Sequence, residues 1–196
     1  MPVEILHESM RRIASEDTDE EHLGEGYGGP TGPTEGPIWI KEKGYLLFSD
    51  IHGNRRMKYA PGEGVSVHKE GTMKANGMTR DREGRLVCCH HSGRCVDAED
   101  LETGEVTMIA DSYKGDKLNR PNDVVVKSDG SVYFTDPPPK IPLTAEDHYP
   151  EQDCAGVYRV SPDGKRINRI VHDFINPNGL CFSPDGRMLA VARYNG

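Results

Sequence analysis

The chain has 196 residues, of which 35% are hydrophobic and 29% are charged, and its formal net charge is −8. This length favours one domain, and an acidic surface repels nucleic acids and anionic lipids, so neither is an expected partner. The sequence has no apolar run of about 18 residues that could span a membrane. The N-terminus also lacks an apolar signal core, so a cytoplasmic location is predicted.

The first part of the chain differs in composition from the rest. Residues 1–30 are predicted to form an acidic and glycine-rich segment, followed by one domain over residues 31–196. The stretch "EDTDEEH", residues 16–22, is expected to be a solvated, mobile tail. "GEGYGG", residues 24–29, fits a glycine-rich dinucleotide pattern, but no strand precedes it and Pro30 interrupts it. We therefore interpret it as a flexible loop.

Short β-type runs bounded by turn residues dominate the remainder, which predicts an all-β fold. The apolar run at residues 37–40, "PIWI", predicts a buried strand, and residues 137–153 are predicted to form an exposed loop. The other predicted strands are "YLLFSD" (45–50), "RLVCCHH" (85–91), "SVYFTD" (131–136), "GVYRV" (156–160) and "MLAVA" (188–192).

Four segments repeat one pattern: a polar residue, a first strand, a turn glycine and a second strand. The polar residues are Glu35, Asn76, Asn122 and Asn178, and the turn glycines are Gly44, Gly84, Gly130 and Gly186. The units start 41, 46 and 56 residues apart. Glycine is needed where a tight hairpin requires positive φ, so the pattern predicts four hairpins in the same register.

Units of about 40–50 residues with about four strands each are typical of β-propeller blades. The first strand of each blade lines the central channel, so the four polar residues are expected to converge there. Carboxylate and carboxamide oxygens suit calcium, magnesium or manganese. Each asparagine taken alone is better explained as an ordinary turn residue, but four polar residues in one register favour a common site.

Several of these segments resemble the gluconolactonase family, which includes regucalcin. The similar motifs are "TEGPIW", "KANGMTRDREGRL", "NRPNDVVVKSDGSVYFTDPP", "GVYRVSPDG" and "PNGLCFSPDGR", and they cover about residues 33–192. The resemblance implies a six-bladed β-propeller, of which this chain would form about three and a half blades. It also implies a divalent cation, calcium first with zinc, manganese or magnesium as alternatives, and a small sugar-type lactone as the substrate to be hydrolysed.

The resemblance further implies roles for individual residues. Glu35 and Asn178 match metal ligands of the family, and Asn122 is expected close to the metal. The residues implied to bind substrate are Arg120, Asn122, Asn76 and His91. Asp136 matches a common family residue with a structural role or a place at a secondary cation site.

One expected residue has no counterpart. Members of the family carry a further metal aspartate, which is also the candidate general base, but here Arg193 of "VAR" stands at the corresponding strand end. No catalytic residue is therefore assigned, and these 196 residues are expected to hydrolyse lactones poorly, unless Asp123 or Asp136 replaces the missing acid. The alternative function is an inactive or structural partial propeller that binds a divalent cation without catalysis. The oligomeric state is left open.

The five cysteines do not suggest a disulfide framework, because their number is odd and two are adjacent. The stretch "CCHHSGRC" contains the zinc-binding residue types Cys88, Cys89, His90, His91 and Cys95. Adjacent strand residues point to opposite faces, so Cys88 and Cys89 cannot easily share one metal, and a second ligand pair is missing. We interpret the stretch as a buried cysteine followed by a channel-facing histidine.

Overall fold

The computed structural model describes residues 3–16, 19–28, 33–139 and 150–194. One short 3-10 helix, Glu8–Arg12, precedes sixteen strands within these ranges. The all-β prediction is confirmed. No helix in the described part of the chain is both long enough and apolar enough to cross a membrane.

The described strands form three four-stranded antiparallel sheets and two two-stranded ones. The first sheet contains β1 (Thr34–Ile40), β2 (Tyr45–Asp50), β3 (Arg55–Ala60) and β4 (Gly64–Glu70). The second contains β5 (Ala75–Arg80), β6 (Leu86–His90), β7 (Cys95–Glu99) and β8 (Val106–Ala110). The third contains β11 (Val124–Val126), β12 (Val132–Asp136), β13 (Gly156–Val160) and β14 (Ile167–Val171). The last hairpin pairs β15 (Pro177–Phe182) with β16 (Leu189–Arg193), and a small one pairs β9 (Ser112–Tyr113) with β10 (Asp116–Lys117).

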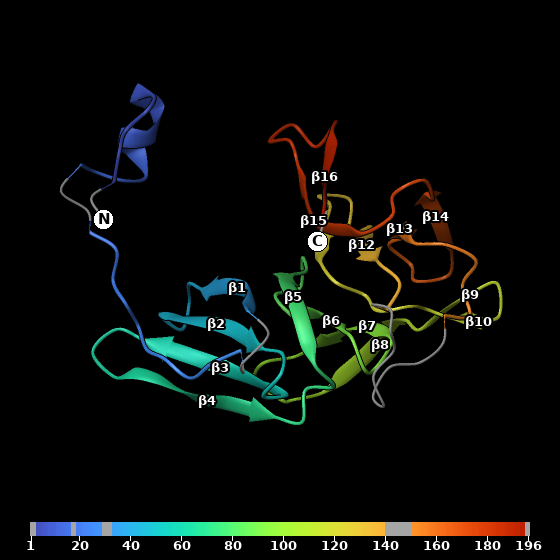
Figure 1. Cartoon of the computed structure of the whole chain (residues 1–196), viewed down its shortest axis with the longest axis horizontal. Coiled ribbons are helices and arrows are strands. Elements are labelled where there is room, and N and C mark those ends of the chain that lie inside the picture. The colour runs from blue at the N-terminus through green and yellow to red at the C-terminus, as the bar shows by residue number, and fades with distance from the viewer. Residues whose placement is uncertain (1–2, 17–18, 29–32, 140–149, 195–196) are drawn as a thin grey trace.

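The sheets follow one another in an open arc (Figure 1), and their first strands contact one another in chain order, β1 to β5, β5 to β11 and β11 to β15. Apart from residues 37–40, the five predicted strands coincide with β2, β6, β12, β13 and β16 to within one residue at each end. All four turn glycines have positive φ, as the repeat predicts.

The prediction of a buried first strand at residues 37–40 is wrong in part. Ile40 is fully buried against the second sheet, but Trp39 is 48% exposed. Successive side chains of a strand point to opposite faces, and only the Ile38–Ile40 face of this edge strand packs on its neighbour. Residues 140–149 of the predicted loop lie outside the described residues.

Apolar side chains fill the interface between each pair of neighbouring sheets. Ile40 and Leu47 of the first sheet pack with Cys88 of the second. Cys89 packs on the other side, in the cluster shared by the second and third sheets. The two adjacent cysteines therefore occupy opposite faces of β6, as predicted, and all five cysteines are free thiols.

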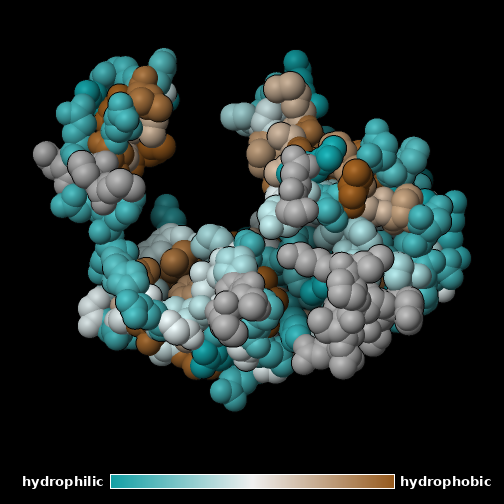
Figure 2. Space-filling model, viewed as in Figure 1, coloured by the Kyte–Doolittle hydropathy of each residue, from teal (hydrophilic) through white to brown (hydrophobic). Residues whose placement is uncertain are grey.

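The N-terminal segment contacts the first sheet through its last described residues. The amide of Gly28 donates to Oδ1 of Asp50 at 2.9 Å, and the ring of Tyr27 meets Phe48 edge-on at 5.7 Å. The loop predicted at residues 24–29 is thus held to the sheet at this end. The part around the short helix stands away from the sheets (Figure 2), with Leu6 and Ile13 exposed.

Two glycines allow the first strands to approach each other at backbone distance. A Cβ at Gly36, where φ is +57°, would overlap the carbonyl oxygen of Asn76. The amide of Gly77 donates to the carbonyl of Asn122 at 2.8 Å, and a Cβ at Gly77 would lie 2.7 Å from that same oxygen. Both glycines directly follow a polar residue of the repeat, so this contact brings those residues together.

We expect Gly36→Ala to destabilise the chain more than Gly44→Ala. Both positions have positive φ, but nothing lies within 4 Å of a Cβ at Gly44. Gly44→Ala should cost about 1–2 kcal/mol for backbone strain alone. Gly36→Ala should cost about 1–3 kcal/mol more because of the added overlap. Urea denaturation of the two variants measures the difference, and equal losses would show that the strands can separate freely here.

Candidate functional site

A pocket of about 250 Å³ lies where the four first strands meet. Its lining is Glu35, Gly36, Pro37, Asn76, Gly77, Met78, Asn122, Asp123, Asn178 and Gly179. All four polar residues of the repeat therefore line one pocket, although the first and last are 143 positions apart in the sequence.

Irregular strand pairing directs three of these four side chains into the pocket. The register shifts after Glu35 in β1, across Asn76 in β5 and across Asn178 in β15. A bulge bends a strand and turns the side chain at that point away from the regular alternation. Each bulge includes the glycine that follows the polar residue, which explains why the same two-residue unit recurs in the sequence.

Buried hydroxyl groups fix the backbone of the next sheet at the pocket. Ser49, next to last in β2, donates to the carbonyl of Asn76 at 2.7 Å. Thr135, next to last in β12, donates to the carbonyl of Asn178 at the same distance. The equivalent position in the first and third sheets thus anchors the polar residue of the sheet that follows each of them, whereas Cys89 occupies this position in the second sheet.

Two carboxylates share the pocket. Burial raises the pKa of Glu35, and the negative charge of Asp123 raises it further. Burial also raises the pKa of Asp123, although the amides of Leu180 and Val124 donate to its two oxygens at 3.1 and 2.9 Å. The lining contains no lysine or arginine, so a bound cation would relieve the repulsion between the two groups.

Asp123 was predicted only as a replacement for a missing acid, and the structure places it in the lining of the pocket. Its one sequence signal is that it directly follows Asn122 in "RPND". The donor set of the pocket fits a hard divalent cation, because it combines two carboxylates with carboxamide oxygens from three further positions.

His91 and Arg120 lie beside the pocket and are not part of its lining. Nδ2 of Asn76 lies 2.9 Å from Nε2 of His91, so the amide donates to the ring nitrogen and is oriented by it. Burial, with the nearby positive charge of Arg120, lowers the pKa of His91 to about 3. His91 is therefore neutral near pH 7 and acts here as a hydrogen-bond acceptor.

Asp136 fixes the segment that leads into the pocket. It is fully buried at the end of β12, and its Oδ2 accepts from the amide of Asn119 at 2.9 Å. Burial raises the pKa of Asp136 to about 7, against the opposing effect of the Asn119 and Arg120 amides. This structural contact is observed, whereas a secondary cation site at Asp136 stays a prediction.

Arg193 stands where the family's acid was expected. Its side chain is exposed, and it lies opposite Pro177 of β15 in the strand register.

These features define a class of protein: consecutive antiparallel sheets whose first strands surround an acidic and amide-lined pocket. The chain belongs to the SMP-30/gluconolactonase/LRE-like family, whose profile matches residues 33–192. A gluconolactonase from Zymomonas mobilis is 36% identical over 172 residues, covering 81% of this chain and 48% of that protein. Pentonolactonase XacC from Haloferax volcanii is 28% identical over 153 residues, covering 77% and 46% respectively. The predicted family resemblance is confirmed.

Solved structures agree with this assignment. A gluconolactonase from Xanthomonas campestris superposes with a TM-score of 0.74 at 35% identity, covering 82% of this chain and 54% of that one. A calcium-binding regucalcin from Agrobacterium tumefaciens has a TM-score of 0.58 at 19% identity, covering 78% and 48%, and shows similarity of fold alone. The chain thus spans about half the length of these relatives.

We expect the stability that Asp136 contributes to depend on pH between about 4 and 7. Its pKa rises from 3.8 to about 7 on folding, so the contribution is full below pH 4 and is lost as pH rises toward 7. The free energy of unfolding of the wild type, minus that of Asp136→Asn, should fall by up to about 1.4 kcal/mol per pH unit in this window. Urea denaturation from pH 4 to 8 tests this, and a pH-independent difference would contradict it.

Proposed function

We propose that the chain belongs to a metal-dependent hydrolase that opens sugar-type lactones. The observation that carries the proposal is the pocket in which Glu35, Asp123 and three asparagines meet. Relatives named gluconolactonase and pentonolactonase support a lactone as the substrate class. The cytoplasmic location and the absence of nucleic-acid and membrane partners stay predictions.

We further propose that each four-stranded sheet is one blade of a six-bladed β-propeller. The three sheets and the last hairpin would then form about three and a half blades, with the domain over residues 31–196 and residues 1–30 preceding it. The sequential contact of the first strands and the similarity to regucalcin support this arrangement.

In this proposal Glu35, Asn122 and Asn178 hold the cation, and calcium suits these oxygen donors best. A bound divalent cation would polarise the lactone carbonyl. Arg120, Asn122 and Asn76 orient the sugar hydroxyl groups, and the His91 acceptor fixes the rotation of the Asn76 amide. Asp123 is the proton acceptor for water, because it lines the pocket and burial raises its pKa.

We expect calcium to raise the thermal midpoint of the wild-type chain. A ligand that binds only the folded state stabilises it by about 2.7 kcal/mol at a hundredfold excess over its dissociation constant. Glu35→Gln should remove most of this gain, because it deletes a charged ligand. Glu63→Gln is the control, since Glu63 is exposed and outside the pocket lining. Equal calcium shifts in both variants would exclude Glu35 as a ligand.

We also expect weak, metal-dependent opening of gluconolactone, measured with a pH indicator and corrected for spontaneous hydrolysis. Loss of a general base typically lowers the rate by about 10²–10⁴, so Asp123→Asn should reduce turnover to the spontaneous rate. Asp173→Asn, which changes an exposed carboxylate, should not. Stabilisation by calcium without any turnover would favour the alternative, a partial propeller that binds the cation without catalysis.

A further inference from the structure

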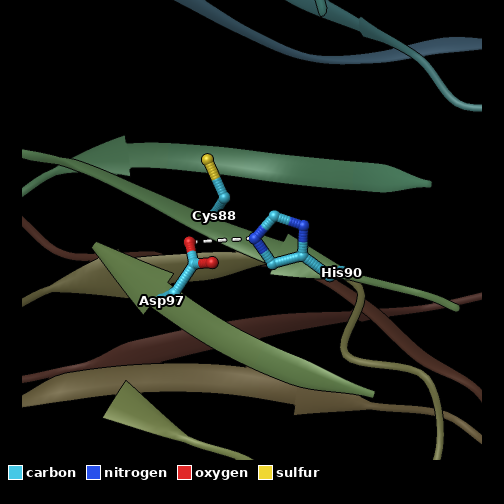
Figure 3. A group of neighbouring side chains, drawn as sticks. All are labelled: Cys88, His90 and Asp97. Atoms are coloured by element: carbon cyan, nitrogen blue, oxygen red, sulfur yellow. Dashed lines mark ion pairs between the residues drawn. The ribbon is translucent and has the colours of Figure 1, made fainter. Parts of the chain in front are cut away.

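A second group of metal-ligating side chains lies inside the second sheet, apart from the pocket. Cys88 and His90 are two residues apart on β6, so they share one face, and Asp97 of β7 pairs directly opposite Cys88. One ligand atom from each lies within 4.8 Å of the other two, and all three residues are buried. Figure 3 shows the three side chains close together, with a dashed line joining His90 and Asp97.

The hydrogen bonding of His90 leaves one ring nitrogen facing a carboxylate. Nδ1 lies 2.8 Å from the carbonyl oxygen of Thr72, which can only accept, so Nδ1 carries the proton. Nε2 lies 2.9 Å from Oδ1 of Asp97, so the contact is an ion pair when the ring is protonated and two facing lone pairs when it is neutral (Figure 3). Nε2 has no hydrogen-bond partner among the described residues. Two lone pairs at this distance repel, so the geometry calls for a cation between them, either a proton or a metal ion.

The donor types favour a metal ion of borderline softness. A thiolate, an imidazole and a carboxylate together suit zinc, which takes three or four such ligands in tetrahedral geometry. A ligating histidine almost always donates its other ring N–H to a carbonyl or carboxylate, as His90 does to Thr72. We propose that Cys88, His90 and Asp97 form a buried zinc site that is chemically distinct from the oxygen-lined pocket.

The surrounding charges are compatible with a bound zinc ion. Nη2 of Arg56 donates to Sγ of Cys88 at 3.4 Å. The same nitrogen lies 2.9 Å from Oε2 of Glu99, so the Glu99 carboxylate offsets the positive charge of the guanidinium. Lys69 contacts the other oxygen of Glu99 at 2.9 Å. On binding, the Cys88 sulfur exchanges its proton for zinc and the proton leaves to solvent.

From the sequence, zinc was disfavoured in the stretch 88–95 because adjacent cysteines point to opposite faces and a second ligand pair is missing. Cys88 and Cys89 do occupy opposite faces of β6. The third ligand, Asp97, lies two positions beyond that stretch and reaches Cys88 and His90 only through strand pairing. All three ligands come from two neighbouring strands, so zinc would tie β6 to β7 on the face that packs against the first sheet.

The test is metal binding by the full chain after treatment with a chelator. One equivalent of bound cobalt(II) should give a thiolate-to-cobalt charge-transfer absorption, whereas cobalt bound to the oxygen donors of the pocket should not. Cys88→Ser should abolish that absorption. It should also weaken zinc binding by more than the roughly 10–100-fold in affinity that is typically lost when a residue hydrogen-bonded to a metal ligand is removed. Cys89→Ser, which changes the equally buried neighbour on the opposite face, should retain it, as should Cys181→Ser at an exposed position. Glu35→Gln should also retain it, which separates this site from the pocket.

Several results would overturn the proposal. One is an absorption that survives Cys88→Ser, and another is its loss in Cys181→Ser. Absence of the thiolate-to-cobalt absorption in the folded wild type would show that a proton, not a metal ion, lies between His90 and Asp97. If Cys88→Ser does not fold, X-ray absorption at the zinc edge of the wild type decides instead, because the proposal requires one sulfur bound to zinc.

Discussion

The architecture depends on backbone contact between the first strands of neighbouring sheets. The amide of Gly77 donates to the carbonyl of Asn122 at 2.8 Å, and Gly36 lies against the carbonyl of Asn76. Neither position has space for a side chain. Because each glycine follows a polar residue, the contact that joins the sheets also gathers carboxylates and amides. Glu35 and Asp123 thereby come close enough to raise the pKa of Glu35. The packing of the sheets and the gathering of the two carboxylates thus have the same origin.

The last residue of the second strand occupies the same structural position in each four-stranded sheet, but its contacts differ from sheet to sheet. Asp50 accepts from the amides of Gly28 and Gly53 and pairs with Arg55. Burial alone would raise the pKa of Asp50, but these donors lower it. In the third sheet Asp136 accepts from the amides of Asn119 and Arg120, and burial raises its pKa to about 7.

In the second sheet His90 occupies this position and reverses the polarity of the contact, because its ring donates to the carbonyl of Thr72. The free ring nitrogen is thereby directed toward Asp97. The proposed zinc site is therefore a variation on the contact that the carboxylates make in the flanking sheets. Its sulfur and nitrogen donors and the oxygen donors of the pocket would select different metal ions.

The sequence by itself determined most second strands, the four turn glycines and the register of Glu35, Asn76, Asn122 and Asn178. These features are local, since hairpin geometry and alternation act over a few residues. Only the tertiary structure decided that Trp39 is half exposed, that Asp123 lines the pocket and that Asp97 lies opposite Cys88. Each of these depends on which strand or sheet lies beside the residue. Strand pairing and sheet packing join segments that are separate in the chain, so short-range patterns do not encode these neighbours.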